Sequence, residues 1–126
     1  MLDSVWDFGD PYEWMARTGK FAPLIVTCAL TGGIQGKESH PALPERAEEI
    51  AAAAREAYEA GASVVHIHGR DPEDFTNCTD DPEVYREILG LVREQCPDVV
   101  LNITTGGGPT TTLEGRLAVV ERISPV

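Results

Sequence analysis

The chain has 126 residues, of which 42% are hydrophobic and 25% charged, and this balance is typical of a folded domain rather than a disordered or fibrous chain. Its formal net charge of −11 disfavours binding to nucleic acid or to anionic membranes, because both are bound through neutralisation of their negative charge. No segment approaches the roughly 18 consecutive apolar residues of a membrane helix, and three widely spaced cysteines without a CxxC pair argue against a disulfide framework.

The first 22 residues have no sustained hydrophobic period and precede the first strand signal. They mix acidic and aromatic side chains, with neither the basic start nor the apolar run of a secretory signal. We therefore expect residues 1–22 to be an N-terminal extension that packs against another part of the protein, and we expect a cytoplasmic protein.

The first structural unit begins after Pro23. Residues 24–30 form a short apolar run without alternation, which predicts a strand buried on both faces of a parallel sheet. Residues 34–44 contain glycine and prolines and have no period, so they predict a loop. Residues 45–60 are rich in alanine, glutamate and arginine, and Gly61 is placed to cap them as a helix.

A second unit follows directly. Residues 62–68 form another apolar run and predict a second buried strand. Asp81 is placed to cap a helix that has Pro82 at its first position, and the apolar stripe of this helix continues until Pro97 prevents its extension.

A third unit starts with residues 99–104, which predict a third strand, and Thr111 with Glu114 three residues later forms a capping-box pattern for a third helix. Strands that alternate with helices predict parallel strands, in an open doubly wound sheet or in a (β/α)8 barrel. Three parallel strands leave two edges unpaired, and another strand is due where the sequence stops. We therefore expect residues 23–126 to be part of a domain that continues beyond this chain.

Two histidines, His66 and His68, lie two residues apart at the carboxyl end of the second predicted strand. Their side chains should point to the same face, at the end of the sheet where α/β proteins bind ligands. Imidazole nitrogens suit zinc, and catalytic zinc usually has three protein ligands. The alternative is a buried pair satisfied by backbone or carboxylate groups. Asp71 and Glu73 are close in sequence, but the sequence does not identify a third ligand.

Other polar groups follow the strand ends. The run Thr104 to Gly108 allows close backbone approach and could bind a carboxylate or phosphate, or it could be an ordinary turn. Arg70 offers a fork for a substrate carboxylate or phosphate, or it could pair with a neighbouring acid. Cys28 is interpreted as a small core residue.

Three motifs in this order resemble the β-keto acid cleavage enzyme family, and the resemblance runs from about Pro23 to Val126. They are residues 23–27 (PLIVT) with Thr31-Gly32, residues 61–71 ending in HIHGRD, and residues 104–107 (TTGG). The resemblance implies a (β/α)8 TIM barrel of about 250 residues, of which this chain would supply three βα units and remain truncated.

The resemblance also implies the site. It assigns a zinc ion to His66, His68 and a later glutamate without a counterpart here, and it assigns the keto acid to Thr104 and Gly107. Gly106 in the same turn and Arg70 remain substrate-binding candidates from their own chemistry. The catalytic base would also lie beyond residue 126. The implied reaction condenses a β-keto acid with acetyl-CoA and yields acetoacetate and a new acyl-CoA, in a protein that forms a homo-oligomer.

One stretch departs from the family pattern. Members that cleave aminohexanoate carry a glutamate after the first TG turn, which recognises the substrate ammonium, whereas residues 33–35 here read GIQ. An amino-substituted substrate is therefore not implied.

Two other functions compete with this interpretation. Amidohydrolases on the same barrel also use an HxH pair, but normally on the first strand, whereas a βα unit precedes His66 here. The other alternative is an inert barrel fragment or a piece of a binding module, which would show neither zinc affinity nor turnover with acetyl-CoA.

Overall fold

A computed structural model describes Tyr12 and residues 23–108 and 111–123. The predicted extension of residues 1–22 therefore lies almost entirely outside the described part of the chain.

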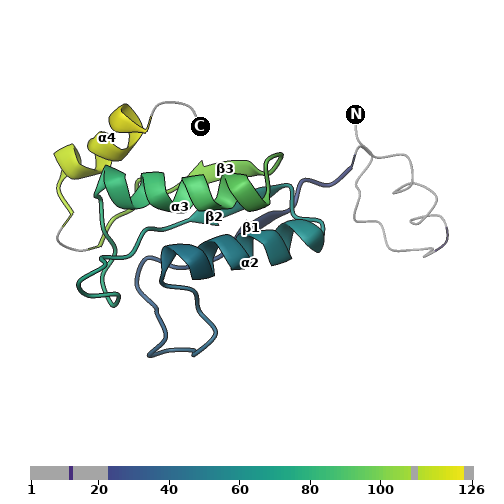
Figure 1. Cartoon of the computed structure of the whole chain (residues 1–126), viewed down its shortest axis with the longest axis horizontal. Coiled ribbons are helices and arrows are strands. Elements are labelled where there is room, and N and C mark those ends of the chain that lie inside the picture. The colour runs from purple at the N-terminus through teal and green to yellow at the C-terminus, as the bar shows by residue number, and fades with distance from the viewer. Residues whose placement is uncertain (1–11, 13–22, 109–110, 124–126) are drawn as a thin grey trace.

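The described residues form three strands and three helices in strict alternation. In chain order these are β1 (Thr27–Ala29), α2 (Ala47–Glu59), β2 (Val64–Ile67), α3 (Pro82–Gln95), β3 (Val100–Ile103) and α4 (Leu113–Arg122). The strands are parallel and lie side by side in the order β1-β2-β3 (Figure 1). The predicted α/β class and parallel sheet are confirmed, although each strand is shorter than the apolar run that predicted it.

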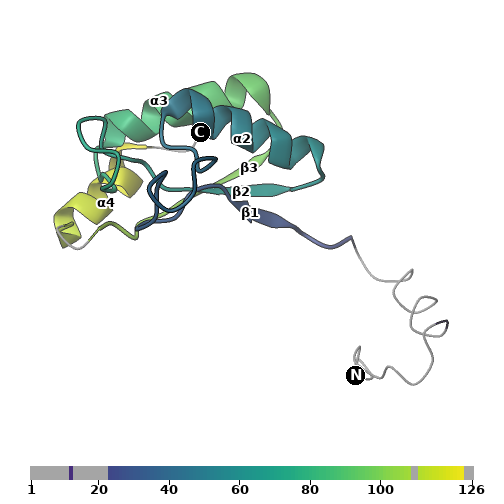
Figure 2. The ribbon, with the colours of Figure 1, turned by 90° about the horizontal axis from the view of Figure 1, so that it is seen from below.

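Both crossover helices cover the same face of the sheet. Figure 2 shows α2 and α3 together on one side of the three strands, while α4 lies at the end of the sheet where the strands finish. A right-handed crossover places its helix on a face that depends on the direction in which the next strand is added. Because β2 and β3 are added in the same direction, α2 and α3 lie on the same side of the sheet. The arrangement therefore has two layers, the sheet and these two helices.

Strand β2 shows most clearly how the two faces differ. Val65 and Ile67 are fully buried under the helices, whereas Val64 and His66, which alternate with them, are only partly buried. Burying an aliphatic side chain of this size stabilises the fold by about 1.5 to 3 kcal/mol. The pair therefore holds one face of β2 against the helices, and the alternation of the strand directs His66 to the open face.

The expected burial of the first strand on both faces was wrong for the described structure. In β1 only Cys28 is partly shielded, and Leu24 and Ile25 before it are 85% and 72% exposed. The apolar run was interpreted correctly as sheet-forming, but burial depends on which elements cover the sheet. Here α2 and α3 cover one face, and among the described residues nothing is layered over the other.

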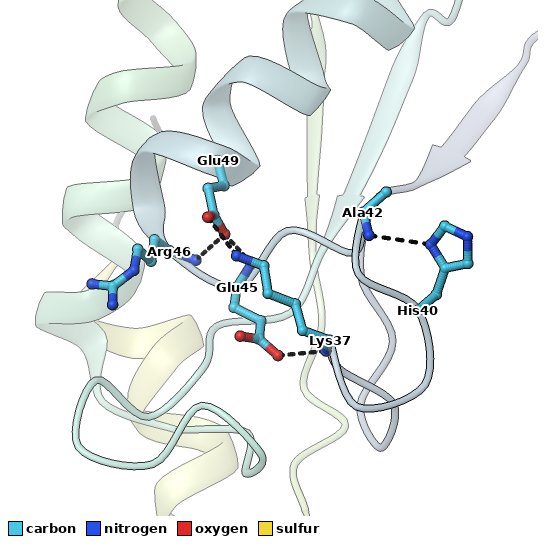
Figure 3. A network of polar contacts seen from close by, with 6 residues as sticks. All are labelled: Lys37, His40, Ala42, Glu45, Arg46 and Glu49. Carbon is cyan, nitrogen blue, oxygen red and sulfur yellow. Dashed lines mark hydrogen bonds and ion pairs between the residues drawn. The ribbon is translucent and has the colours of Figure 1, made fainter.

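The loop that leads into α2 is held by a network of charged groups (Figure 3). The Glu49 carboxylate accepts hydrogen bonds from the backbone N–H groups of Glu45 and Arg46 and from Lys37 Nζ. Glu45 in turn accepts from the backbone N–H of Lys37. Glu49 thus satisfies N–H groups at the start of the helix and ties α2 to the loop that follows β1.

The other helix starts test the predicted caps. The Asp81 side chain accepts from the Glu83 N–H and Pro82 is the first residue of α3, as predicted. The predicted cap of the last helix at Thr111 was wrong by one residue, because the Thr112 hydroxyl accepts from the Gly115 N–H. Gly61, after α2, adopts a φ of 103°, which explains glycine at that helix end.

None of the described helices combines the length and apolar character needed to cross a membrane.

The Glu49 network predicts a pH-dependent stability. The Glu45 N–H, and after it Lys37, lower the pKa of Glu49 to about 2. A lowered pKa stabilises the fold above the unfolded value of about 4.3, and this contribution is lost as the pH falls toward about 2. Because the Glu49 side chain is 36% exposed, we expect Glu49→Ala to lower the free energy of unfolding by only about 0.5 to 1 kcal/mol at pH 7.

Urea unfolding of the parent protein and of Glu49→Ala between pH 7 and pH 2 measures the difference in their free energies of unfolding. This difference should shrink at the acid end. Glu49→Gln is the matched control, because it keeps an acceptor for the N–H groups but has no charge to titrate. A Glu49→Ala deficit of equal size at both ends of the range would contradict the assignment.

Candidate active site at the carboxyl end of the sheet

The rings of His66 and His68 meet at the carboxyl end of β2. Their Nε2 atoms are 3.2 Å apart, and the ring centroids are 5.1 Å apart with the planes inclined by 76°. Both side chains are partly buried. The structure thus brings together the two nitrogens that the sequence placed on one face of the strand.

The other ring nitrogen of His66 has a partner that the sequence did not single out. His66 Nδ1 lies 2.7 Å from Asn102 Oδ1, and His66 and Asn102 are register partners on β2 and β3. Asn102 is two residues before Thr104, so strand alternation from Thr104 would have pointed to it. Without the register, however, nothing in the sequence placed Asn102 opposite a histidine.

His68 packs against the loop after β1. Its Nδ1 is 3.9 Å from Cys78 Sγ, and Cys78 donates a hydrogen bond to the Gly33 carbonyl oxygen. A Cβ added at Gly33 would lie 3.2 Å from His68 Cε1, so a larger residue would crowd the ring. Burial, followed by the nearby His66 and Arg70, lowers the pKa of His68, which favours its neutral form. A neutral imidazole is the form that binds metals.

Cys78 was not a candidate from the sequence, because its position depends on the fold of the loop. Residues Arg70 and Cys78 form an isolated antiparallel bridge that folds the segment between them into a turn. Burial raises the pKa of the Cys78 thiol, so it stays protonated at neutral pH and can act as a hydrogen-bond donor.

Arg70 has partners other than those expected from the sequence. Its side chain is 1% exposed, and its guanidinium donates to the backbone carbonyl oxygens of Gly32, Gln35 and Thr76. Its Nε has no hydrogen-bond partner among the described residues. The guanidinium therefore does not present an open fork to a substrate, nor does it pair with Asp71, and instead it fastens the loop after β1 to the loop after β2.

The acidic residues near the histidines are used locally. Asp71 accepts from the Glu73 N–H, and Asp74 accepts from Thr76 and Asn77 within the same turn. Within residues 23–108 and 111–123, no group of three His, Cys, Asp or Glu side chains is arranged to hold a metal ion. The part of the chain described here thus contains a two-histidine arrangement without a carboxylate ligand.

Residues 104–108, here called the glycine turn, lie beside the end of β2. The Thr104 N–H donates to the Ile67 carbonyl oxygen, so Thr104 is directly adjacent to the strand that carries the histidines. The Thr104 hydroxyl accepts from the Gly106 N–H at 2.9 Å, and a Cβ at Gly107 would collide with Thr111. A small pocket of about 10 Å³ lies next to this turn, and its lining includes Thr79, Tyr85 and Val119 with the turn itself but neither histidine.

Comparison with known proteins identifies relatives that match most of the chain. The family model for the beta-keto acid cleavage enzyme matches residues 23–126. A 3,5-dioxohexanoate:acetyl-CoA acetone transferase from Paraburkholderia graminis is 40% identical over 102 residues, which are 81% of this chain and 32% of that protein. A 3-keto-5-aminohexanoate cleavage enzyme from Fusobacterium nucleatum is 44% identical over 98 residues, covering 78% of this chain and 35% of the relative.

A third relative has a different named substrate. The 3-oxoadipate:acetyl-CoA acetyltransferase from Cupriavidus necator is 31% identical over 85 residues, which are 68% of this chain and 29% of that protein. The chain therefore spans about a third of the length of the curated relatives it matches.

The contacts of Arg70 predict a structural role that can be measured. Arg70→Met keeps much of the side-chain length but removes every donor, so several carbonyl groups lose their partner. We expect the free energy of unfolding to fall by about 1 to 3 kcal/mol, and hydrogen exchange to become faster across residues 32–36.

Arg55→Met is the matched control, because the Arg55 side chain is 57% exposed and forms a surface ion pair with Glu59. Its effect should stay within about 0.5 kcal/mol. If both variants lose the same free energy of unfolding, and hydrogen exchange across residues 32–36 is unchanged in Arg70→Met, then Arg70 does not hold the loop after β1.

Proposed function

Because the chain belongs to the beta-keto acid cleavage enzyme family, we propose that it carries the two-histidine part of a zinc-dependent site for cleavage of a β-keto acid with acetyl-CoA. The observation that carries this proposal is the 3.2 Å approach of His66 Nε2 and His68 Nε2 at the carboxyl end of β2. Acetyl-CoA is a co-substrate in the names of two of the relatives described above, which supports the proposed reaction type.

We propose a (β/α)8 barrel as the complete architecture. A doubly wound sheet places helices on both faces because its strand order reverses, whereas a barrel adds every strand in one direction and keeps its helices outside. The consecutive order β1-β2-β3 with α2 and α3 on one face supports the barrel. The open face, with exposed Val100, would then be the side that lines the barrel interior.

The two histidines fit a zinc ion. Two nitrogens bound tetrahedrally to one zinc at about 2.0 to 2.1 Å each lie about 3.3 Å apart, close to the distance between the two Nε2 atoms. His66 and His68 would hold the ion, with a carboxylate from outside residues 23–126 as a further ligand. When bound, zinc supplies Lewis-acid stabilisation of the negative charge that develops on the keto oxygen.

Thr104 and the glycine turn would bind the substrate carboxylate. The Thr104 hydroxyl accepts one hydrogen bond from Gly106 and can still donate one, because a hydroxyl has a single O–H donor of its own. Gly107 would bring the backbone close to the substrate, and Gly106 would keep the hydroxyl oriented. Arg70 is left out of this substrate site, since its donors are directed to backbone carbonyl groups.

The proposed reaction transfers an acyl group to CoA by forming one carbon–carbon bond and cleaving another. The α-carbon of the β-keto acid, after losing a proton, would attack the acetyl-CoA carbonyl and expel CoA thiolate. The thiolate would then add to the original keto carbonyl, and retro-Claisen cleavage of the carbon–carbon bond would release acetoacetate and a new acyl-CoA. The residues described here would bind and orient the keto acid. The base that starts the reaction would come from another part of the protein.

Zinc binding is tested by removing each histidine in the full-length protein. We expect His66→Ala and His68→Ala each to reduce bound zinc and to reduce acetyl-CoA-dependent cleavage of β-keto acids. His40→Ala is the matched control among the three histidines, because His40 is exposed and its Nδ1 only accepts from the Ala42 N–H (Figure 3). Zinc content and turnover that are unchanged in the first two variants would exclude the proposed function.

Substrate binding is tested at the glycine turn. Thr104→Val nearly keeps the side-chain volume but removes the hydroxyl, so kcat/KM for the keto acid should fall by about 1 to 3 kcal/mol, or about 5- to 150-fold. Zinc content should stay unchanged. The neighbouring exposed Thr105 provides the control variant Thr105→Val. If Thr104→Val loses metal, or only unfolds while activity per folded molecule is kept, Thr104 has a structural role instead.

A further inference from the structure

An asparagine on the open face of β3 needs an explanation. Asparagine is depleted in strands, yet Asn102 stands between Val100 and Thr104 on the strand neighbouring the histidines. It is the register partner of His66, and its Oδ1 lies 2.7 Å from His66 Nδ1. This is the shortest contact that either histidine ring makes with another residue among those described.

The chemistry of the two atoms decides where the proton lies. An amide oxygen only accepts hydrogen bonds, so His66 Nδ1 must be the donor and must carry the ring hydrogen. A neutral imidazole has one N–H, and His66 Nε2 is therefore left with a lone pair. That lone pair is on the side of the ring facing His68 Nε2, 3.2 Å away.

We propose that Asn102 is a positioning residue that holds His66 in the tautomer with hydrogen on Nδ1, so that Nε2 is directed as an acceptor toward the space shared with His68. This role rests on the proposed function, in which both Nε2 atoms bind zinc. Metal-binding histidines generally donate their second N–H to an oxygen that fixes the ring, and loss of this partner weakens metal binding about 10- to 100-fold.

The two histidines are not equivalent in this respect. His68 Nδ1 has only the Cys78 sulfur at 3.9 Å, and a thiol is a weak acceptor. His68 can therefore place its hydrogen on Nε2 and donate to His66 Nε2 while no metal is bound. In the metal-free protein the two rings should accordingly have opposite tautomers, with His66 as the fixed partner and His68 as the adaptable one.

The experiment reads the tautomer directly in the full-length protein. Long-range proton–nitrogen NMR correlations of the metal-free protein, at a pH above about 8 where histidine is neutral, distinguish the two ring nitrogens of His66. We compare the parent with Asn102→Leu, which has a similar shape but no acceptor, and with Asn102→Asp, whose carboxylate can also accept from Nδ1. Val100→Ala, on the same face of β3, controls for disturbance of the strand.

We expect His66 to carry its hydrogen on Nδ1 in the parent, in Asn102→Asp and in Val100→Ala, and to lose this preference in Asn102→Leu. Zinc affinity, measured by competition with a chromophoric chelator, should fall about 10-fold or more in Asn102→Leu and change little in the other two. A parent His66 with its hydrogen on Nε2, or an Asn102→Leu protein that keeps the parent tautomer, would overturn the role of Asn102. A parent that binds no zinc but has the expected tautomer would instead overturn the proposed function, because the NMR measurement requires no metal.

Discussion

The burial of Val65 and Ile67 beneath α2 and α3 is the constraint on which the rest of the site depends. Both side chains are fully inaccessible, and a one-residue shift of β2 would expose them and bury the histidines in their place. Such a shift would cost the transfer free energy of two aliphatic side chains and would also bury imidazole groups away from their partners. The hydrophobic layer between sheet and helices thus determines the side on which chemistry can occur.

A second constraint holds the loops around the histidines. Arg70 and Cys78 both come from the segment after β2, and both donate to backbone carbonyl groups in the loop after β1. A buried arginine is unusual, but here backbone oxygens satisfy most of its donors. These hydrogen bonds tie the two loops together, and His68 has a close neighbour at Gly33. The loop conformation is consequently part of the histidine geometry and not independent of it.

The open face of the sheet connects the fold with the proposed barrel. Its side chains change in character from apolar to polar along the strands, from Val64 and Val100 to His66 and Asn102 and then to His68 and Thr104. Apolar residues therefore lie at the beginning of the strands, where a barrel interior would need filling, and polar groups lie at the end where its substrates would bind. This gradient follows from the register of β2 and β3, and in the proposed barrel it would let one surface both fill the interior and bind substrate.

The sequence by itself determined the order of strands and helices, the shared face of His66 and His68, and the Asp81 cap, because each of these depends on residues only a few positions apart. The motifs at the strand ends also sufficed to identify the family. The one-residue error at Thr111 arose because two threonines in succession offer the same hydroxyl, and only the path of the backbone selects Thr112.

The partners of Arg70 and the pairing of His66 with Asn102 were decided by the tertiary structure. Arg70 reaches carbonyl groups 35 and 38 residues away, and His66 reaches an amide 36 residues away. Such contacts depend on strand register and loop path, which the packing of the whole sheet against its helices establishes and which local sequence patterns do not encode.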